Sequence, residues 1–223
     1  MKYKVLFEDN HLIIVNKPAG VLVHGDKTRD RTLVDEVKSY IKEKYQKPGA
    51  VYLGVIHRLD RPVSGAIVFA RTSKALVRMN KLFKDRKIEK IYHALTDHRP
   101  PEIEDRITHY ILKDSIKNIS KAFRSEKNGA KKAILEYELI AEIDRINLMS
   151  VNPVTGRPHQ IRVQLMTLGC PIIGDLKYGY AIPNKDKSIC LHCYQLKFIH
   201  PVTGKTISAT APYPNLPVWK VFN

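Results

Sequence analysis

The chain has 223 residues, of which 43% are hydrophobic and 27% charged, a composition typical of ordinary soluble proteins. Lysine and arginine outnumber the acidic residues by 38 to 22, which gives a formal net charge of +16 and a sequence pI near 9.7. No apolar run approaches the ~18 residues of a transmembrane helix, and no signal-peptide core follows the first residues. We expect a cytoplasmic protein without membrane contact. The charge favours a polyanionic partner such as nucleic acid, although charge alone would also fit a membrane surface or simple solubility.

The cysteines give little support for a disulfide framework or a metal site. Cys170, Cys190 and Cys193 are too few and too late in the chain for a disulfide framework. Cys190 and Cys193 have the CxxC spacing, but in a strand-like run their odd offset directs the two thiols to opposite faces, and no second pair follows. The sequence also has no Walker loop and no GxGxxG after a strand. We expect no metal, no nucleotide cofactor and no other cofactor.

The order of elements predicts a mixed α/β (α+β) protein. Residues 5–7 and 12–15 predict a hairpin, and amphipathic helices are expected at 32–45, capped by Thr32, and after residue 73, capped by Ser73. Further strands are predicted at 51–56, 66–70, 88–95, 133–140, 146–151 and 191–200. A short helix is expected to begin at Pro158 and to stop at Gly169. Because no repeat, low-complexity segment or clear boundary interrupts the chain, we predict one domain over residues 1–223.

Residues 111–132 are basic and contain few large apolar side chains. Two interpretations stay open: a long charged hairpin or loop that lies along a phosphate backbone, or a solvated connector. The expected helix after residue 73 also has a basic face, which is either solvated surface or a contact with RNA.

The segment 57–65 places the carboxylate of Asp60 between Arg58 and Arg61, on a loop flanked by two strand-like apolar runs. A loop fixed by a rigid scaffold is a common place for functional groups. When the segment is taken alone, an ion pair with either arginine or a turn cap is the commoner explanation of such an aspartate.

Two later blocks also carry chemical groups. In residues 90–94, Lys90-x-Tyr92-x-Ala94 lies in an alternating, strand-like run, where a lone tyrosine more often packs in the core. In residues 155–165, Gly156 permits a turn, and His159 and Arg162 fall on one side of the expected helix.

The blocks at residues 57–65, 90–94 and 156–162 together resemble the motifs of the RluA family of pseudouridine synthases, in the same order. The resemblance runs from about residue 6 to residue 201 and implies a large, mainly antiparallel sheet with flanking helices. Val63 stands where the family usually has threonine, which bears on substrate preference more than on chemistry. Many relatives have a small N-terminal RNA-binding domain; here we expect the short form, in which the catalytic domain grips the RNA itself.

The resemblance also implies roles for individual residues. Asp60 would be the catalytic nucleophile, and Arg162 would pair with it and hold it ionised. Tyr92, the third catalytic candidate, would pack on the target base, and its phenol is a candidate to assist proton transfer. A base inside folded RNA must be flipped out to reach such a site, and Arg58 is our candidate to fill the space it leaves. Further candidates for RNA binding are His57, Arg61, Arg157, His159 and Gln160. The implied function is isomerisation of specific uridines in rRNA, tRNA or both, by a monomer that needs no cofactor.

Three other functions are compatible with parts of this sequence. A glycoside hydrolase needs a second carboxylate near Asp60, and Asp175 is the nearest candidate by motif membership. A non-catalytic RNA-binding or ribosome-assembly protein would satisfy the charge, but it has no need of Asp60, Tyr92 and Arg162 together. A serine hydrolase based on Ser64 lacks the GxSxG elbow.

Overall fold

The computed structural model describes residues 3–25 and 30–222. The chain divides into two units, one of Met1–Glu89 with Cys193–Pro214 and one of Lys90–His192 with Asn215–Asn223. The single domain expected from the sequence stays a prediction, because two compact units of one chain can still depend on each other to fold. Among the described residues, no helix has the length and apolar character needed to cross a bilayer.

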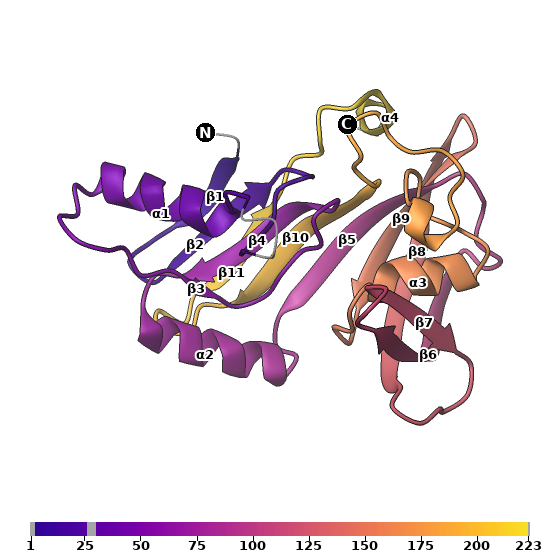
Figure 1. Cartoon of the computed structure of the whole chain (residues 1–223), viewed down its shortest axis with the longest axis horizontal. Coiled ribbons are helices and arrows are strands. Elements are labelled where there is room, and N and C mark those ends of the chain that lie inside the picture. The colour runs from indigo at the N-terminus through magenta and orange to yellow at the C-terminus, as the bar shows by residue number, and fades with distance from the viewer. Residues whose placement is uncertain (1–2, 26–29, 223) are drawn as a thin grey trace. The chain divides into compact units, whose positions relative to one another are not determined.

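The first unit is built on strands in the order β1-β2-β4-β10, with β3 paired to β4 and β11 paired to β10 (Figure 1). The bounds are β1 Lys4–Glu8, β2 Leu12–Lys17, β3 Gly54–Val55, β4 Ser64–Ala70, β10 Leu191–Ile199 and β11 Thr206–Thr210. Every residue of β4 is buried, and β2 is buried at all but one position. These two buried central strands are a rigid support for the loop that precedes β4.

Two helices accompany these strands, α1 (Leu33–Lys44) and α2 (Ser73–Lys84). The predicted cap of α1 is confirmed: Thr32 Oγ1 accepts the Asp35 N–H at 3.2 Å, and the Asp35 side chain closes a capping box. The predicted cap of α2 is wrong by one residue. Thr72 is the extended residue, and its Oγ1 accepts the Ala75 N–H at 3.1 Å, so Ser73 is already helical.

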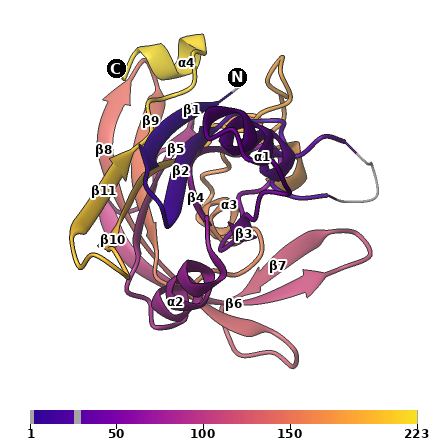
Figure 2. The same cartoon turned by 90° about the vertical axis from the view of Figure 1, so that its left-hand side faces the viewer.

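The second unit contains an antiparallel series of strands in the order β5-β9-β8-β6-β7. Its elements are β5 Glu89–Thr96, β6 Glu104–Asp114, β7 Ile119–Phe123, β8 Lys131–Ile143, β9 Ile146–Pro153, α3 Gln160–Thr167, η1 Leu176–Tyr178 and α4 Pro217–Lys220. Figure 2 shows the hairpin of β6 and β7. A core cluster of Ile111, Ala133, Val163 and Tyr178 joins β6, β8, α3 and η1. Residues 111–132 therefore contain a hairpin, and its contact with a phosphate backbone stays a prediction.

Two local predictions fail for reasons that the structure makes clear. Of residues 51–56 only Gly54–Val55 form a strand, because β10 lies along the same edge of β4 and leaves only Phe69 and Ala70 for pairing. Helix α3 begins at Gln160 and not at Pro158, because His159 has the left-handed backbone conformation, with φ 54°. Strand β11 and helix α4 were not predicted.

Candidate functional site

Asp60 lies on a turn between β3 and β4 in the first unit. The Val63 N–H donates to the Asp60 carbonyl at 3.0 Å and closes the turn, while the Asp60 side chain is half-buried. The Arg61 carbonyl accepts the Gly20 N–H at 2.8 Å. The turn is therefore anchored at two points: to β4, which follows it, and to the loop that follows β2.

Lys17, the last residue of β2, forms a third anchor for this turn. Its side chain is fully buried, and its Nζ donates to the Pro18 carbonyl at 2.9 Å and to the Arg61 carbonyl at 3.2 Å. Burial lowers the pKa of Lys17 to about 7, and the charge of Asp60 opposes that effect. Lys17 was not among the site residues predicted from the sequence. The available signal was a lysine at the end of an apolar strand, directly before a proline.

The buried ammonium of Lys17 predicts a pH-dependent stability. Its folded pKa of about 7 lies below the ordinary 10.5, so the unfolded chain binds more protons between these values, and stability rises with pH across this window. Between pH 7 and about pH 9.5, we expect the free energy of unfolding of wild type to rise by about 3 kcal/mol relative to that of Lys17→Met. Urea unfolding of both proteins measures this difference. Lys42→Met, at an exposed lysine of α1, is the control and should show no such difference. A difference in the free energy of unfolding between wild type and Lys17→Met that stays constant across this pH range would contradict the prediction.

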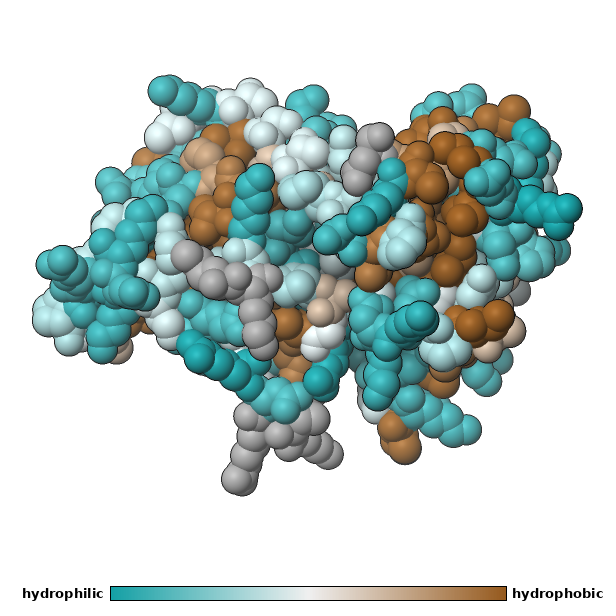
Figure 3. Space-filling model, turned by 90° about the horizontal axis from the view of Figure 1, so that it is seen from above, coloured by the Kyte–Doolittle hydropathy of each residue, from teal (hydrophilic) through white to brown (hydrophobic). Residues whose placement is uncertain are grey.

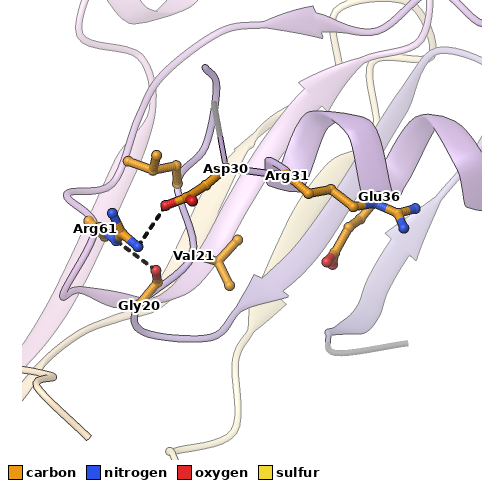
Figure 4. Close-up of a pocket in the computed structure, with 7 residues that line it drawn as sticks. Gly20, Val21, Asp30, Arg31, Glu36 and Arg61 are labelled. Atoms are coloured by element: carbon orange, nitrogen blue, oxygen red, sulfur yellow. Dashed lines mark hydrogen bonds and ion pairs between the residues drawn. The ribbon is translucent and has the colours of Figure 1, made fainter. Parts of the chain in front are cut away.

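A pocket of about 400 Å³ lies beside the Asp60 turn (Figure 4). It is lined by Gly20, Val21, Leu22, Asp30, Arg31, Glu36 and Arg61. Arg61 Nε donates to the Gly20 carbonyl at 3.0 Å, and Nη2 pairs with Asp30 at 2.9 Å. Both side chains of this ion pair are about half exposed, so the pair contributes little to stability. Contact of Arg61 with RNA stays a prediction.

His57 and Arg58 occupy different environments on the same loop. The His57 ring stacks on Phe83 with centroids 5.0 Å apart, and its Nε2 accepts the Val68 N–H at 3.1 Å, which ties the loop to β4 and α2. Arg58 is exposed, and its Nη1 donates to His24 Nε2 at 3.1 Å. His57 thus braces the scaffold, while Arg58 lies at the surface. Their contact with RNA stays a prediction.

In the second unit, Arg162 on α3 forms a buried bidentate pair with Asp175. Nε and Nη2 of Arg162 lie 2.7 and 2.8 Å from the two carboxylate oxygens of Asp175, and both side chains are almost fully buried. The guanidinium carbon also lies 4.9 Å from the centroid of the Tyr178 ring. From the sequence, Asp175 was a candidate only for the second carboxylate of a glycoside hydrolase. Because both of its oxygens are bonded to Arg162, Asp175 is poorly suited to donate a proton to a sugar.

Gln160 and Arg157 brace the loop that leads into α3. Gln160 Oε1 accepts the Thr155 hydroxyl at 2.8 Å and the Arg157 N–H at 2.9 Å, and its Nε2 donates to the Ile134 carbonyl at 2.9 Å. Arg157 Nε donates to the Lys132 carbonyl at 2.9 Å. These bonds give Gln160, which is buried, a structural role. RNA binding by Gln160 or Arg157 stays a prediction.

The two remaining candidates of this unit lie on different elements. Tyr92 is a half-buried residue of β5 opposite Val151 of β9, so the predicted strand is correct. His159 precedes α3, and its Nδ1 lies 2.7 Å from the Tyr178 hydroxyl. Tyr178, like Lys17 and Asp175, was not among the predicted site residues.

All three cysteines are free and buried. Burial raises the pKa of the Cys170 and Cys190 thiols to about 11. Within residues 3–25 and 30–222, no group of three or more His, Cys, Asp or Glu side chains is arranged to hold a metal ion.

Known proteins resemble this chain in sequence and in fold. A profile of the family described as RNA pseudouridylate synthase matches residues 11–167. The chain is 33% identical to ribosomal large subunit pseudouridine synthase C of Buchnera aphidicola, with 93% of this chain and 66% of that relative aligned. It is 30% identical to tRNA pseudouridine synthase C of Vibrio parahaemolyticus, with 93% of this chain and 89% of the relative aligned.

The structural comparison bears out the predicted fold. Human RNA pseudouridylate synthase domain containing 4 superposes with a TM-score of 0.79 at 24% identity, covering 95% of this chain and 89% of its own. Human RNA pseudouridylate synthase domain containing 1 gives a TM-score of 0.75 at 25% identity, covering 96% and 85%. The predicted mainly antiparallel α+β fold with flanking helices is confirmed.

Proposed function

Because this chain belongs to the RNA pseudouridylate synthase family, we propose that it isomerises specific uridines to pseudouridine in rRNA, tRNA or both. The observation that carries the proposal is the family match over residues 11–167, which includes all three motif blocks. The chain spans 66% of the length of the Buchnera relative, so the activity is proposed for the chain as it stands. The relatives' names include both a ribosomal and a tRNA synthase, which supports RNA as the substrate and leaves its class open.

The reaction requires an ionised carboxylate and no external group. The bond from ribose C1′ to N1 breaks, the uracil turns, and C1′ joins C5; the C5 hydrogen leaves to water while N1 gains a proton. We assign the carboxylate to Asp60, whose turn is held by Lys17, Gly20 and β4. By resemblance to the family, we propose Arg162 as the partner of Asp60 and Tyr92 as the ring that packs on the uracil.

RNA binding by this chain is supported by its exposed basic side chains. Figure 3 shows hydrophilic side chains over much of one face of the molecule, with hydrophobic ones in a few patches. The basic residues of the segment 111–132 are all exposed: Lys113, Lys117, Lys121, Arg124, Lys127, Lys131 and Lys132. If about six phosphates are contacted, log K should fall against log salt with a slope of roughly −4 to −5. The target uridine would be flipped out, at a cost of a few kcal/mol.

The test is release of tritium from RNA labelled at C5 of uridine, with rRNA and tRNA as separate substrates. We expect wild type to release tritium from at least one of them, because C5 must lose its hydrogen when the new bond forms. RNA binding is measured on the same samples. Binding without release from either RNA would refute the proposal and favour the alternative, a non-catalytic RNA-binding or ribosome-assembly protein.

A further inference from the structure

The guanidinium of Arg162 is held on one edge and on one face. Asp175 takes Nε and Nη2 in a bidentate pair, which fixes the plane of the group, and the Tyr178 ring lies against its face at 4.9 Å. These contacts leave Nη1 as the nitrogen that the bidentate pair does not use. Its direction is set by the positions of Asp175 and Tyr178, because a planar group fixed at one edge can move only if its supports move.

Tyr178 is itself fixed by hydrogen bonds from two other segments. Its hydroxyl oxygen accepts the Ser120 N–H at 2.8 Å and lies 2.7 Å from His159 Nδ1. Burial raises the pKa of Tyr178, so the phenol keeps its hydrogen. While its oxygen accepts the Ser120 N–H, the phenol O–H is placed to donate to His159 Nδ1.

The residues that contact Tyr178 are themselves held in place by strain and by a further hydrogen bond. His159 holds φ 54°, which is unfavourable for a residue other than glycine and persists only where surrounding contacts impose it. The Ser120 hydroxyl donates to the Pro158 carbonyl at 2.8 Å, which joins β7 to the loop that contains His159. Three segments that lie far apart in sequence, at residues 120, 159 and 178, thus meet at one phenol.

We propose that Tyr178 is a positioning residue for Arg162, and that Ser120 and His159 hold Tyr178 against the guanidinium. The inference rests on the proposed function, since it gives Arg162 a role in the isomerisation. Tyr178 touches no reacting atom; it acts through the direction of the Arg162 side chain. Because β7 also belongs to the basic hairpin, the same contacts connect a surface segment with a buried arginine.

Two substitutions separate the contributions of the phenol oxygen and the ring. Tyr178→Phe keeps the ring under Arg162 and removes the bonds to Ser120 and His159; Tyr178→Leu removes the ring as well. A misplacement of about 1 Å can cost about 100-fold in rate, so we expect losses of about 10-fold for Tyr178→Phe and about 100-fold for Tyr178→Leu in the single-turnover rate. The RNA dissociation constant should change less than about twofold. Tyr180→Phe removes a nearby phenol whose interaction is with Asp97, and it should retain the wild-type rate.

A double substitution distinguishes positioning from a general loss of structure. If Tyr178 acts through Arg162, then Tyr178→Phe or Tyr178→Leu should cause no further loss of rate in an Arg162→Met background. Additive losses, or full activity of both Tyr178 single variants beside an impaired Arg162→Met, would overturn the inference. Full activity of Arg162→Met would do so too. Failure of the proposed function looks different, because wild type itself would then release no tritium. If Tyr178→Leu does not fold, Tyr178→Phe carries the test.

Discussion

Asp60→Asn is expected to abolish tritium release, with a rate at least about 1,000-fold below wild type. Asparagine has nearly the same shape as aspartate but cannot carry the negative charge that the reaction requires. The Asp60 carbonyl, which closes the turn with the Val63 N–H, is unchanged by the substitution, so the turn should persist. The measurement is single-turnover tritium release from C5-labelled RNA, on the RNA that wild type modifies.

RNA binding should survive the same substitution, because removing one negative charge from a basic protein does not weaken its attraction for phosphate. Asp85→Asn is the matched control: Asp85 follows α2, is exposed and pairs only weakly with Lys81 at 3.7 Å. It should behave as wild type in both assays. A rate for Asp60→Asn above about a tenth of wild type would exclude Asp60 as the nucleophile.

Gly65→Ala is expected to destabilise the protein by about 3–5 kcal/mol. Gly65 has φ 115°, and a Cβ there would lie on the backbone nitrogen and carbonyl of Cys193 in β10, nearer than real Cβ atoms approach. Backbone cannot move aside as a flexible side chain does, so β4 and β10 would have to separate. Because β4 also anchors the Asp60 turn, activity should fall with stability.

Gly20→Ala is the matched control for this effect. Gly20 also has a positive φ, 84°, but a Cβ there would meet nothing within 4 Å. It should therefore cost only the strain of the left-handed conformation, about 1–2 kcal/mol. Urea unfolding of the two variants and wild type measures the difference. Equal stabilities of Gly65→Ala and Gly20→Ala would show that the close approach of β10 is not what requires glycine.

Local patterns predicted most elements, and tertiary pairing decided the exceptions. Alternation and apolar runs located β1, β2, β4, β5, β8 and β9, because these strands have one or two buried faces. The same pattern predicted a longer β3 than the structure has, because β10 already pairs with most of that edge of β4. The left-handed conformation of His159 likewise arises from contacts that no local propensity encodes.

The motif blocks predicted the central residues of the candidate site. The residues that support them from distant parts of the sequence were not predicted. Asp60, Tyr92 and Arg162 stand in recognisable blocks, and their roles stay predictions. The supports of these residues were not foreseen: Lys17 lies 44 positions before Arg61, whose carbonyl it binds, and Ser120 lies 58 positions before Tyr178. In the unfolded chain a charged or phenolic side chain is hydrogen-bonded to water. Its position in the sequence therefore does not indicate which protein group it will bind once it is buried.

The three buried thiols make the segments that contain them observable by chemical labelling. With pKa values near 11, Cys170 and Cys190 are ionised at pH 7 in only about one molecule in ten thousand, so a thiol-specific reagent meets an unreactive group in the closed protein. Cys193 lies in β10, with its backbone directly against Gly65. Modification of its sulfur therefore reports the opening of this strand pair, and the labelling rate under native conditions follows how often the pair opens, with no cysteine introduced by mutation.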